Sequence, residues 1–143
     1  MLGNLDMRII VLILPMLSTT MLCGAQPIDV LMKNNWISDK PATVIWINAH
    51  RPSSPAIEKI KNLLFGKLKI SFTTDTVTTD LDGKVEKYSQ KIIGQTQHAV
   101  AAITHDVNLD RDVIVTIEID DDEMGYWIYN SQYDIKEHFI PVK

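Results

Sequence analysis

Hydrophobic and polar residues alternate in several short stretches of the chain beyond Gly66, which is typical of β-strands that bury one face. The alternation is clearest at Leu68–Phe72 and at Val113–Ile119. Asp82-Gly83 lies between two further stretches and predicts a β-hairpin. The other strands are predicted at 77–79, 85–93, 97–104, 126–130 and 136–142. Six or seven strands at this spacing predict an antiparallel meander that closes into a small barrel or half-barrel.

Two helices are predicted before Gly66. In the second, at 55–65, apolar residues recur at helical spacing after the Ser54-Pro55 pair, and Gly66 ends the pattern. The first, at 40–50, is ambiguous, because its β-branched residues fit a strand equally well. Ser38 or Asp39 as an N-terminal cap, with Pro41 in the first turn, favours the helix. The fold class is therefore mainly β with a short helical N-terminal part, and these helices are expected to cover an open end or a face of the barrel.

The N-terminal segment has the pattern of an export signal. Ile9–Leu14 is apolar but much shorter than the about 20 residues that span a bilayer. Arg8 precedes it, and Cys23-Gly24-Ala25 places small residues before a cleavage site at Gln26. We therefore predict a signal peptide at 1–25, with Met7 as an alternative start, and a single domain at 26–143. The protein is expected to be periplasmic or secreted.

Cys23 leaves a second possibility for the signal, which is lipoprotein anchoring through this cysteine. Leu22 and Met21 fit that signal poorly, since a small residue is preferred directly before the lipidated cysteine. Cleavage after Ala25 removes the only cysteine of the chain. The mature domain then has no disulfide, so it must be held together by its own hydrophobic core.

Composition and charge narrow the class of protein further. The chain has 143 residues, of which 45% are hydrophobic, and a formal net charge of −4. This length and hydrophobic content predict one folded domain and exclude general disorder. The acidic balance argues against nucleic-acid binding, which normally needs a basic face. No stable membrane span is expected once the signal peptide is removed.

Catalytic and metal-binding motifs are weak in this sequence. Asp106–Asp112 alternates oxygen-bearing side chains as a calcium loop does, but Arg111 replaces the required glycine and Ile117 replaces the bidentate glutamate. The four histidines are scattered, and no Gly-x-Ser-x-Gly elbow is present. We predict no metal, no cofactor and no enzymatic activity, with a site assembled in space as the alternative.

Aromatic residues and one glutamate are the remaining candidates for a ligand site. Large side chains either form the core of a disulfide-free domain or line a pocket for a small apolar ligand. Glu137 is predicted to face the same side as Phe139. If that side is the barrel interior, Glu137 is a ligand anchor or a salt-bridge partner, and otherwise it is a charge at the rim. The candidate ligand-binding residues are Trp36, Phe72, Tyr88, Trp127, Tyr129, Glu137 and Phe139.

Four segments together resemble a known family. They are Trp36-Ile37-Ser38-Asp39, the helical stretch that ends at Gly66, Tyr126–Tyr129 and Lys136–Phe139. The arrangement resembles small exported lipocalin-like β-barrel proteins of the bacterial envelope, although Asn34 stands where true lipocalins carry glycine. The resemblance implies a lipocalin-like barrel that binds a small apolar or amphipathic ligand, without shared catalytic residues.

A different class of function is also open. A small, exported, acidic domain without catalytic motifs fits an envelope protein-interaction module such as an inhibitor or an immunity protein. The acidic stretches 106–112 and 120–123 would then steer a basic protein partner.

Overall fold

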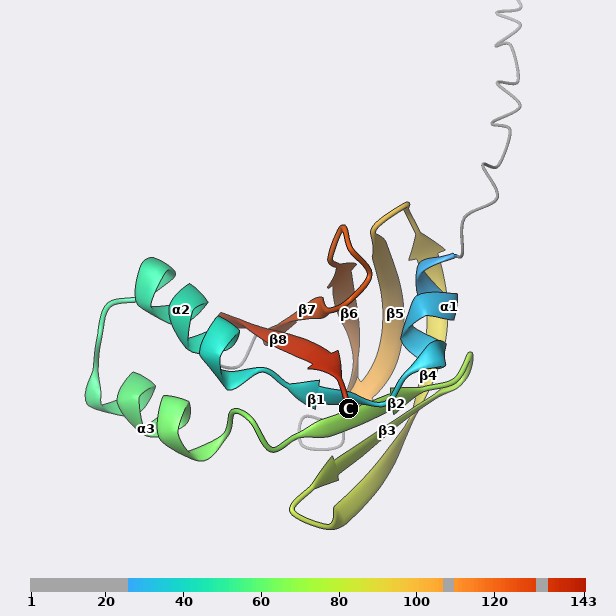
Figure 1. The fold of residues 1–143 in the computed structure, drawn as a ribbon. Coiled ribbons are helices and arrows are strands. Elements are labelled where there is room, and N and C mark those ends of the chain that lie inside the picture. Colours follow the sequence, from blue (N-terminus) through green and yellow to red (C-terminus); the bar gives the residue numbers. More distant parts are fainter. Residues whose placement is uncertain (1–25, 107–109, 131–133) are drawn as a thin grey trace, which may run out of the picture.

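Eight strands form a closed antiparallel barrel in which each strand pairs with its neighbours in chain order (Figure 1). The structure is a computed structural model that describes residues 26–106, 110–130 and 134–143. Pairing of β1 with β8, through Ser38 opposite Phe139, closes the barrel. The strands are β1 Trp36–Ser38, β2 Lys69–Phe72, β3 Thr76–Leu81, β4 Lys84–Gln95, β5 Ala99–Asp106, β6 Arg111–Ile119, β7 Tyr126–Asn130 and β8 Ile135–Pro141.

The predicted fold class is confirmed, because the protein is mainly β with a short helical N-terminal part. The predicted hairpin is also present, with Leu81 opposite Lys84 across a two-residue turn. Asp82 and Gly83 have φ values of 52° and 87°, the left-handed conformation that such turns require. The count of six or seven strands was too low. The strand that was not predicted is β1, Trp36–Ser38, because three residues are too few to show an alternating pattern.

Both predicted helices are present, as α2 Lys40–His50 and α3 Pro55–Leu63. Asp39 caps α2 by accepting a hydrogen bond from the Ala42 amide at 3.3 Å, and Ser54 caps α3 by accepting one from the Ile57 amide at 3.2 Å. These caps, together with the proline in each first turn, outweigh the β-branched residues of α2.

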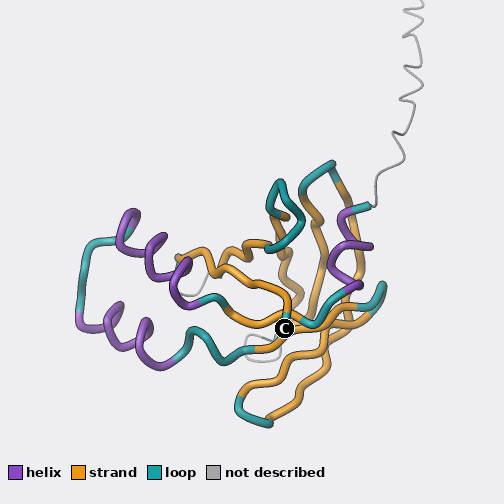
Figure 2. The backbone as a smooth tube through the Cα atoms, in the orientation of Figure 1, coloured by secondary structure: helices purple, strands orange, loops and turns teal. Residues whose placement is uncertain are grey.

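The helices were expected to cover an open end or a face of the barrel, and α2 packs against β8 through Thr43 and Ile47. Both helices then extend to one side of the barrel as an arm, at the left of Figure 2. There Ile47, Phe65 and Ile135 form a small hydrophobic core of their own. We refer to residues 40–67, which include α2 and α3, as the helical arm. It carries five Lys or Arg residues and a single Glu.

A third helix covers one end of the barrel. Residues Ile28, Val30 and Leu31 of α1 Pro27–Lys33 are buried in the same core as the inner strand residues. The indole Nε1 of Trp36 donates a hydrogen bond to the Leu31 carbonyl at 2.8 Å. The Ile28 amide lies 3.3 Å from Gln95 Oε1, so α1 covers the end at which β4 finishes.

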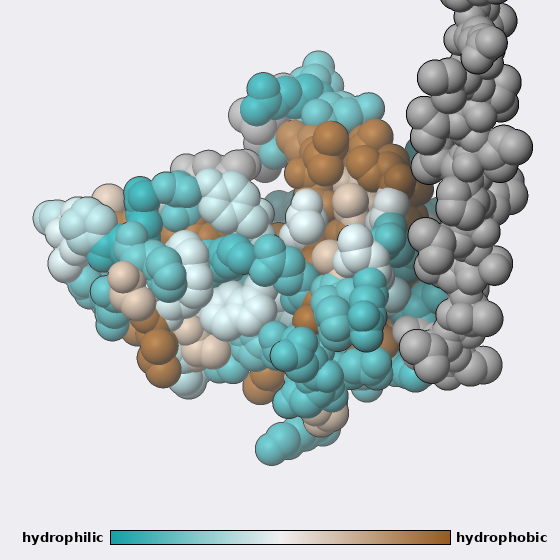
Figure 3. All heavy atoms as spheres, turned by 90° about the horizontal axis from the view of Figure 1, so that it is seen from above, coloured by the Kyte–Doolittle hydropathy of each residue, from teal (hydrophilic) through white to brown (hydrophobic). Residues whose placement is uncertain are grey.

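The arm also exposes hydrophobic side chains. Ile45 is 70% exposed, and Leu63 and Leu64 are exposed as well. Seen from above, the arm at the left of Figure 3 carries hydrophobic atoms among hydrophilic ones. Among the described residues, no helix is long and apolar enough to cross a membrane.

The predicted signal peptide, residues 1–25, lies outside the described residues, as do positions 107–109 of the Asp106–Asp112 stretch. Export, signal cleavage and lipidation of Cys23 therefore stay predictions.

Candidate functional site

The end of the barrel beneath α1 is filled by aromatic side chains. Tyr126 stacks on Phe139 with ring centroids 5.0 Å apart. Trp36 and Phe72 lie nearly perpendicular to the same tyrosine ring, with ring centroids 4.8 and 5.7 Å from it. All four residues are buried. Three of the candidate ligand residues, Trp36, Phe72 and Phe139, therefore form the hydrophobic core at this end, as the core alternative predicted.

At the opposite end, Ile135 at the start of β8 is buried under Ile47 and Phe65, but many other side chains on the inner face are only half buried. Alternation along β4 places Glu86 and Tyr88 on the same face as the buried Gln90, and the register opposes Gln90 to Thr104 and Thr104 to Val113. This end is the far end from α1, because α1 contacts the last residue of β4. We call it the open end. Its half-buried inner residues are Leu68, Val77, Thr79, Glu86, Tyr88, Thr104, Val113, Val115 and Ile128.

Glu137 lies where the aromatic core meets the open end. It faces inward on β8, two positions from Phe139 and opposite Ile128. The hydroxyl of Ser38 donates a hydrogen bond to Glu137 Oε1 at 2.6 Å and accepts one from the Gly66 amide at 2.9 Å. Burial raises the pKa of Glu137 to about 7, and the hydrogen bond from Ser38 opposes that shift. The rim-charge alternative for Glu137 is therefore wrong.

Tyr126 brings a second polar group into this interior. Its hydroxyl is buried and has no hydrogen-bond partner among the described residues. Burial, and to a smaller extent the charge of Glu137, raise the pKa of Tyr126 well above its usual value. Buried hydroxyls in folded proteins nearly always have a partner. A carboxyl and a phenol thus face an otherwise apolar interior.

Tyr88 contributes a polar group nearer the rim of the open end. Its hydroxyl donates a hydrogen bond to the carboxylate of Glu86, which raises the pKa of Tyr88. Glu86 also forms an ion pair with Lys84 at 2.6 Å, beside the hairpin turn. These contacts fix the tyrosine at the mouth of the inner face.

Two of the candidate ligand residues are on the wrong side of the barrel. Tyr126 faces inward, so alternation along β7 turns Trp127 and Tyr129 outward. Trp127 packs beside His138 with ring centroids 4.5 Å apart, and Tyr129 is 48% exposed. The seven candidates therefore do not share one site. Glu137 and Tyr88 remain at the open end, above a floor of core aromatics.

The sequence did not predict a cluster of one histidine and two aspartates on the outer face of the barrel. His138 Nδ1 lies 3.0 Å from Asp39 Oδ2, and its Nε2 lies 2.8 Å from Asp120 Oδ2. Each ring nitrogen is thus within hydrogen-bonding distance of a carboxylate. The His138 amide also donates to Thr43 Oγ1 at 2.9 Å. This clamp joins the start of α2, β8 and the turn after β6. Asp39 and His138 are 99 positions apart, and no local pattern signals such a contact.

His105 and two aspartates were considered as a metal site. His105 lies 3.1 Å from Asp112 and 3.5 Å from Asp110, where β5 ends and β6 begins, and all three side chains are exposed. Across residues 26–106, 110–130 and 134–143, no group of three His, Cys, Asp or Glu side chains is arranged to hold a metal ion.

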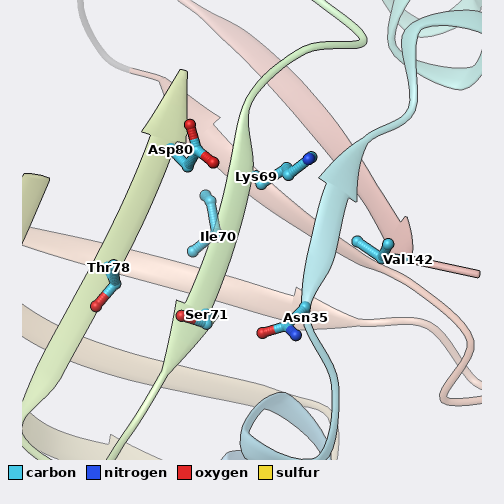
Figure 4. A pocket seen from close by; sticks show the side chains of 7 residues that line it. All are labelled: Asn35, Lys69, Ile70, Ser71, Thr78, Asp80 and Val142. Atoms are coloured by element: carbon cyan, nitrogen blue, oxygen red, sulfur yellow. The ribbon is translucent and has the colours of Figure 1, made fainter. Parts of the chain in front are cut away.

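A depression of about 300 Å³ lies over β2 and β3, next to β1 and the C-terminal end of β8 (Figure 4). The cross-strand pairs Lys69–Asp80 and Ser71–Thr78 form much of its wall. The depression is broad and open to solvent, and its polar residues are at most half buried. Its lining residues are Asn35, Lys69, Ile70, Ser71, Thr78, Asp80 and Val142.

The fold and the site together define a closed eight-stranded antiparallel β-barrel with one packed end and one end whose inner face is half exposed. No protein-family model, curated protein or solved structure matches this chain.

Proposed function

We propose that this protein is an exported, non-enzymatic binding protein of lipocalin-like type that holds a small apolar or amphipathic ligand at the open end of its barrel. The observation that carries the proposal is the half-buried inner face around Glu137, where apolar side chains surround a largely buried carboxyl. Ligand sites generally combine such an apolar lining with a small number of polar groups that orient the ligand.

Burial of the inner face supplies the driving force for binding. Leu68, Val77, Val115 and Ile128 pack against the core but remain partly accessible. Covering apolar surface releases about 25 cal/mol per Å². The stacked aromatics under α1 form a rigid floor, so little order is lost when a ligand binds.

Substitutions at two neighbouring positions on β6 test whether the ligand binds at the inner face. Val115 faces inward at the open end, whereas Ile114 faces outward and is 68% exposed. Val115→Gln is expected to weaken binding of decanol, an uncharged ten-carbon amphiphile, about tenfold or more, and Ile114→Gln is expected to leave it unchanged. Amide chemical shifts in an NMR titration report both binding and folding of the variants.

The native ligand is tested separately, by mass spectrometry under non-denaturing conditions on protein purified from its source. A bound small molecule in a fixed ratio supports the proposal. If neither an adduct nor decanol binding is found, or if both β6 variants bind decanol as the parent protein does, the proposal is wrong.

Export is the second part of the proposal, and it rests on the pattern of residues 1–25. Expression of the full chain in a bacterial host should yield a periplasmic protein whose mass corresponds to residues 26–143. A lipidated product that begins at Cys23 would show that the protein is anchored to a membrane. An uncleaved product would contradict export.

The exposed hydrophobic residues of the helical arm favour a second candidate, an envelope protein-interaction module such as an inhibitor or an immunity protein. Exposed acids at Asp121–Glu123 would steer a basic protein partner. Cross-linking followed by mass spectrometry, with Asp121→Lys and Asp122→Lys as variants, tests this candidate. A partner whose association rate is unaffected by the charge reversals would exclude the steering role.

A further inference from the structure

We propose that the ligand of the open end carries a positively charged amine head group, which binds at Glu137 while the apolar body of the ligand covers the inner face. This inference rests on the proposed ligand-binding function and adds the chemical class of the ligand. It follows from three features of the interior: the partners of Glu137, the sign of the neighbouring charges, and the acceptors available to a head group.

Glu137 has a hydrogen bond but no counter-charge. The hydroxyl of Ser38 donates this hydrogen bond, at 2.6 Å. No Lys, Arg or His of the described chain forms an ion pair with it, including Lys40, whose side chain packs beside Gly66. Attraction between a carboxylate and a cation is much stronger in a poorly solvated site than in water. An entering ammonium would therefore supply the charge partner that the protein itself does not.

Acidic side chains predominate among the inward positions toward the open end, which are occupied by Glu86, Asp106 and Glu137. The cations of the same strand parity lie beside the other two acids: Lys84 is paired with Glu86, and Arg111 is opposite Asp106 in the register of β5 and β6. A head group at Glu137 would therefore meet a carboxylate, which repels an anion.

The basic residues next to Glu137 in the sequence face away from it. Lys136 forms an ion pair with Glu118 at 2.7 Å on the outer face, and His138 lies between Asp39 and Asp120. On the neighbouring strand β1, the Ser38 hydroxyl donates a hydrogen bond to Glu137, and the charge of Glu137 contributes to the raised pKa of Tyr126 on β7.

The hydrogen-bonding groups match an amine as well. An alkylammonium has three N–H donors and no acceptor. The carboxylate of Glu137 accepts such bonds, and the buried hydroxyl of Tyr126 is a further acceptor in the same interior. A head group without donors, such as a quaternary ammonium, would match only the charge.

The test compares three ligands with the same ten-carbon chain, which are decylamine, decanol and decanoate, each below the concentration at which it aggregates. At pH 8, decylamine is expected to bind the mature protein at least tenfold more tightly than decanol, and decanoate more weakly than decanol. Glu137→Gln should remove the preference, so that the variant binds decylamine no more tightly than decanol. Glu118→Gln, which removes an outward-facing carboxylate, is the matched control and should retain the preference.

A second measurement on the parent protein does not depend on any variant. Because the pKa of Glu137 is about 7, the affinity for decylamine should rise from pH 5 to pH 8, while the affinity for decanol changes little. The alkylammonium itself stays charged over this range, since alkylamines titrate near pH 10.

The outcomes separate this inference from the proposed function. Equal affinity for the three ligands, a preference for decanoate, or an amine preference that survives Glu137→Gln overturns the inference and leaves the binding function in place. Failure of all three ligands to bind overturns the binding function itself, and with it the amine inference.

Discussion

The hydroxyl of Ser38 lies 2.6 Å from Glu137 Oε1, and this contact joins residues that are 99 positions apart. Ser38 ends β1 and Glu137 lies within β8, so the hydrogen bond spans the pairing that closes the barrel. The same hydroxyl accepts from the Gly66 amide, which ties the end of the helical arm to that junction. The polar group that we assign to ligand binding is thus also part of the seam that holds the barrel shut.

Glu137→Gln is expected to stabilise the protein at alkaline pH. The carboxyl titrates at about 7 in the folded protein and near 4.5 when solvated, so the native state binds the extra proton between these values. Stability therefore falls as pH rises from about 4.5 to 7, and then levels off. Glutamine keeps an acceptor for Ser38 and carries no charge. The variant should gain about 1–3 kcal/mol at pH 8, allowing for solvent access at the open end, and nothing below pH 4.

Urea unfolding at pH 4 and pH 8 measures this difference. A variant that loses stability between these pH values as steeply as the parent protein would show that another group carries the pH dependence.

Gly125→Ala is expected to destabilise the protein by about 1–3 kcal/mol, because the added methyl group overpacks the clamp around His138. A Cβ at this position would lie 2.4 Å from Asp120 Oδ2 and 2.6 Å from His138 Nε2. Gly94→Ala is the matched control, since nothing lies within 4 Å of its added Cβ. Thermal unfolding of both variants provides the comparison, and equal melting temperatures would contradict the packing argument.

Asp39→Asn and Asp39→Ala separate two roles of one carboxylate. Asp39 caps α2 and also lies 3.0 Å from His138 Nδ1. Asparagine retains the cap but loses the charged hydrogen bond, which should cost about 1–2 kcal/mol. Alanine loses the cap as well, and should cost about 1 kcal/mol more.

Chemical denaturation measures these losses. Asp112→Asn serves as the control because it removes a carboxylate beside His105 at an exposed site, where the expected change is below about 1 kcal/mol. If Asp39→Asn is as harmless as Asp112→Asn, the clamp does not contribute to stability.

Trp36→Phe is expected to loosen α1. The substitution removes the hydrogen bond from the indole to the Leu31 carbonyl and leaves a space in the aromatic core. A loss of about 2–3 kcal/mol should follow, with faster hydrogen exchange at the amides of α1. Trp127→Phe, on the outer face, should leave exchange in α1 unchanged. Equal exchange rates in the two variants would show that Trp36 does not hold the helix over the barrel end.

Local chemistry explains how much of the fold could be predicted from the sequence. The alternation in β6, the Asp82-Gly83 turn and the Ser54 cap depend on residues that are close in the chain, so the strands, the hairpin and α3 were predictable. The three-residue strand β1 was missed, because its evidence is its pairing with β8, about a hundred positions away.

For the candidate site, too, the sequence predicted the local relationships between residues but not those that depend on closure of the barrel. Alternation along one strand was enough to place Glu137 on the side of Phe139 and to separate Trp127 and Tyr129 from Tyr126. Alternation could not predict which face of a strand lies inside the barrel, because that depends on how the sheet closes. Trp127 and Tyr129 were included as ligand residues for that reason, although they face outward.

By itself, the sequence determined the β-rich class, the order of most strands and the positions of α2 and α3, because each follows from hydrophobic periodicity, caps and turns within a few residues. Only the tertiary structure decided which end α1 covers, that Glu137 is buried beside Ser38, and that His138 lies between Asp39 and Asp120. The physical reason is closure of the barrel. Pairing β1 with β8 brings residues a hundred positions apart into contact, and the burial that sets the pKa of Glu137 exists only after that contact forms.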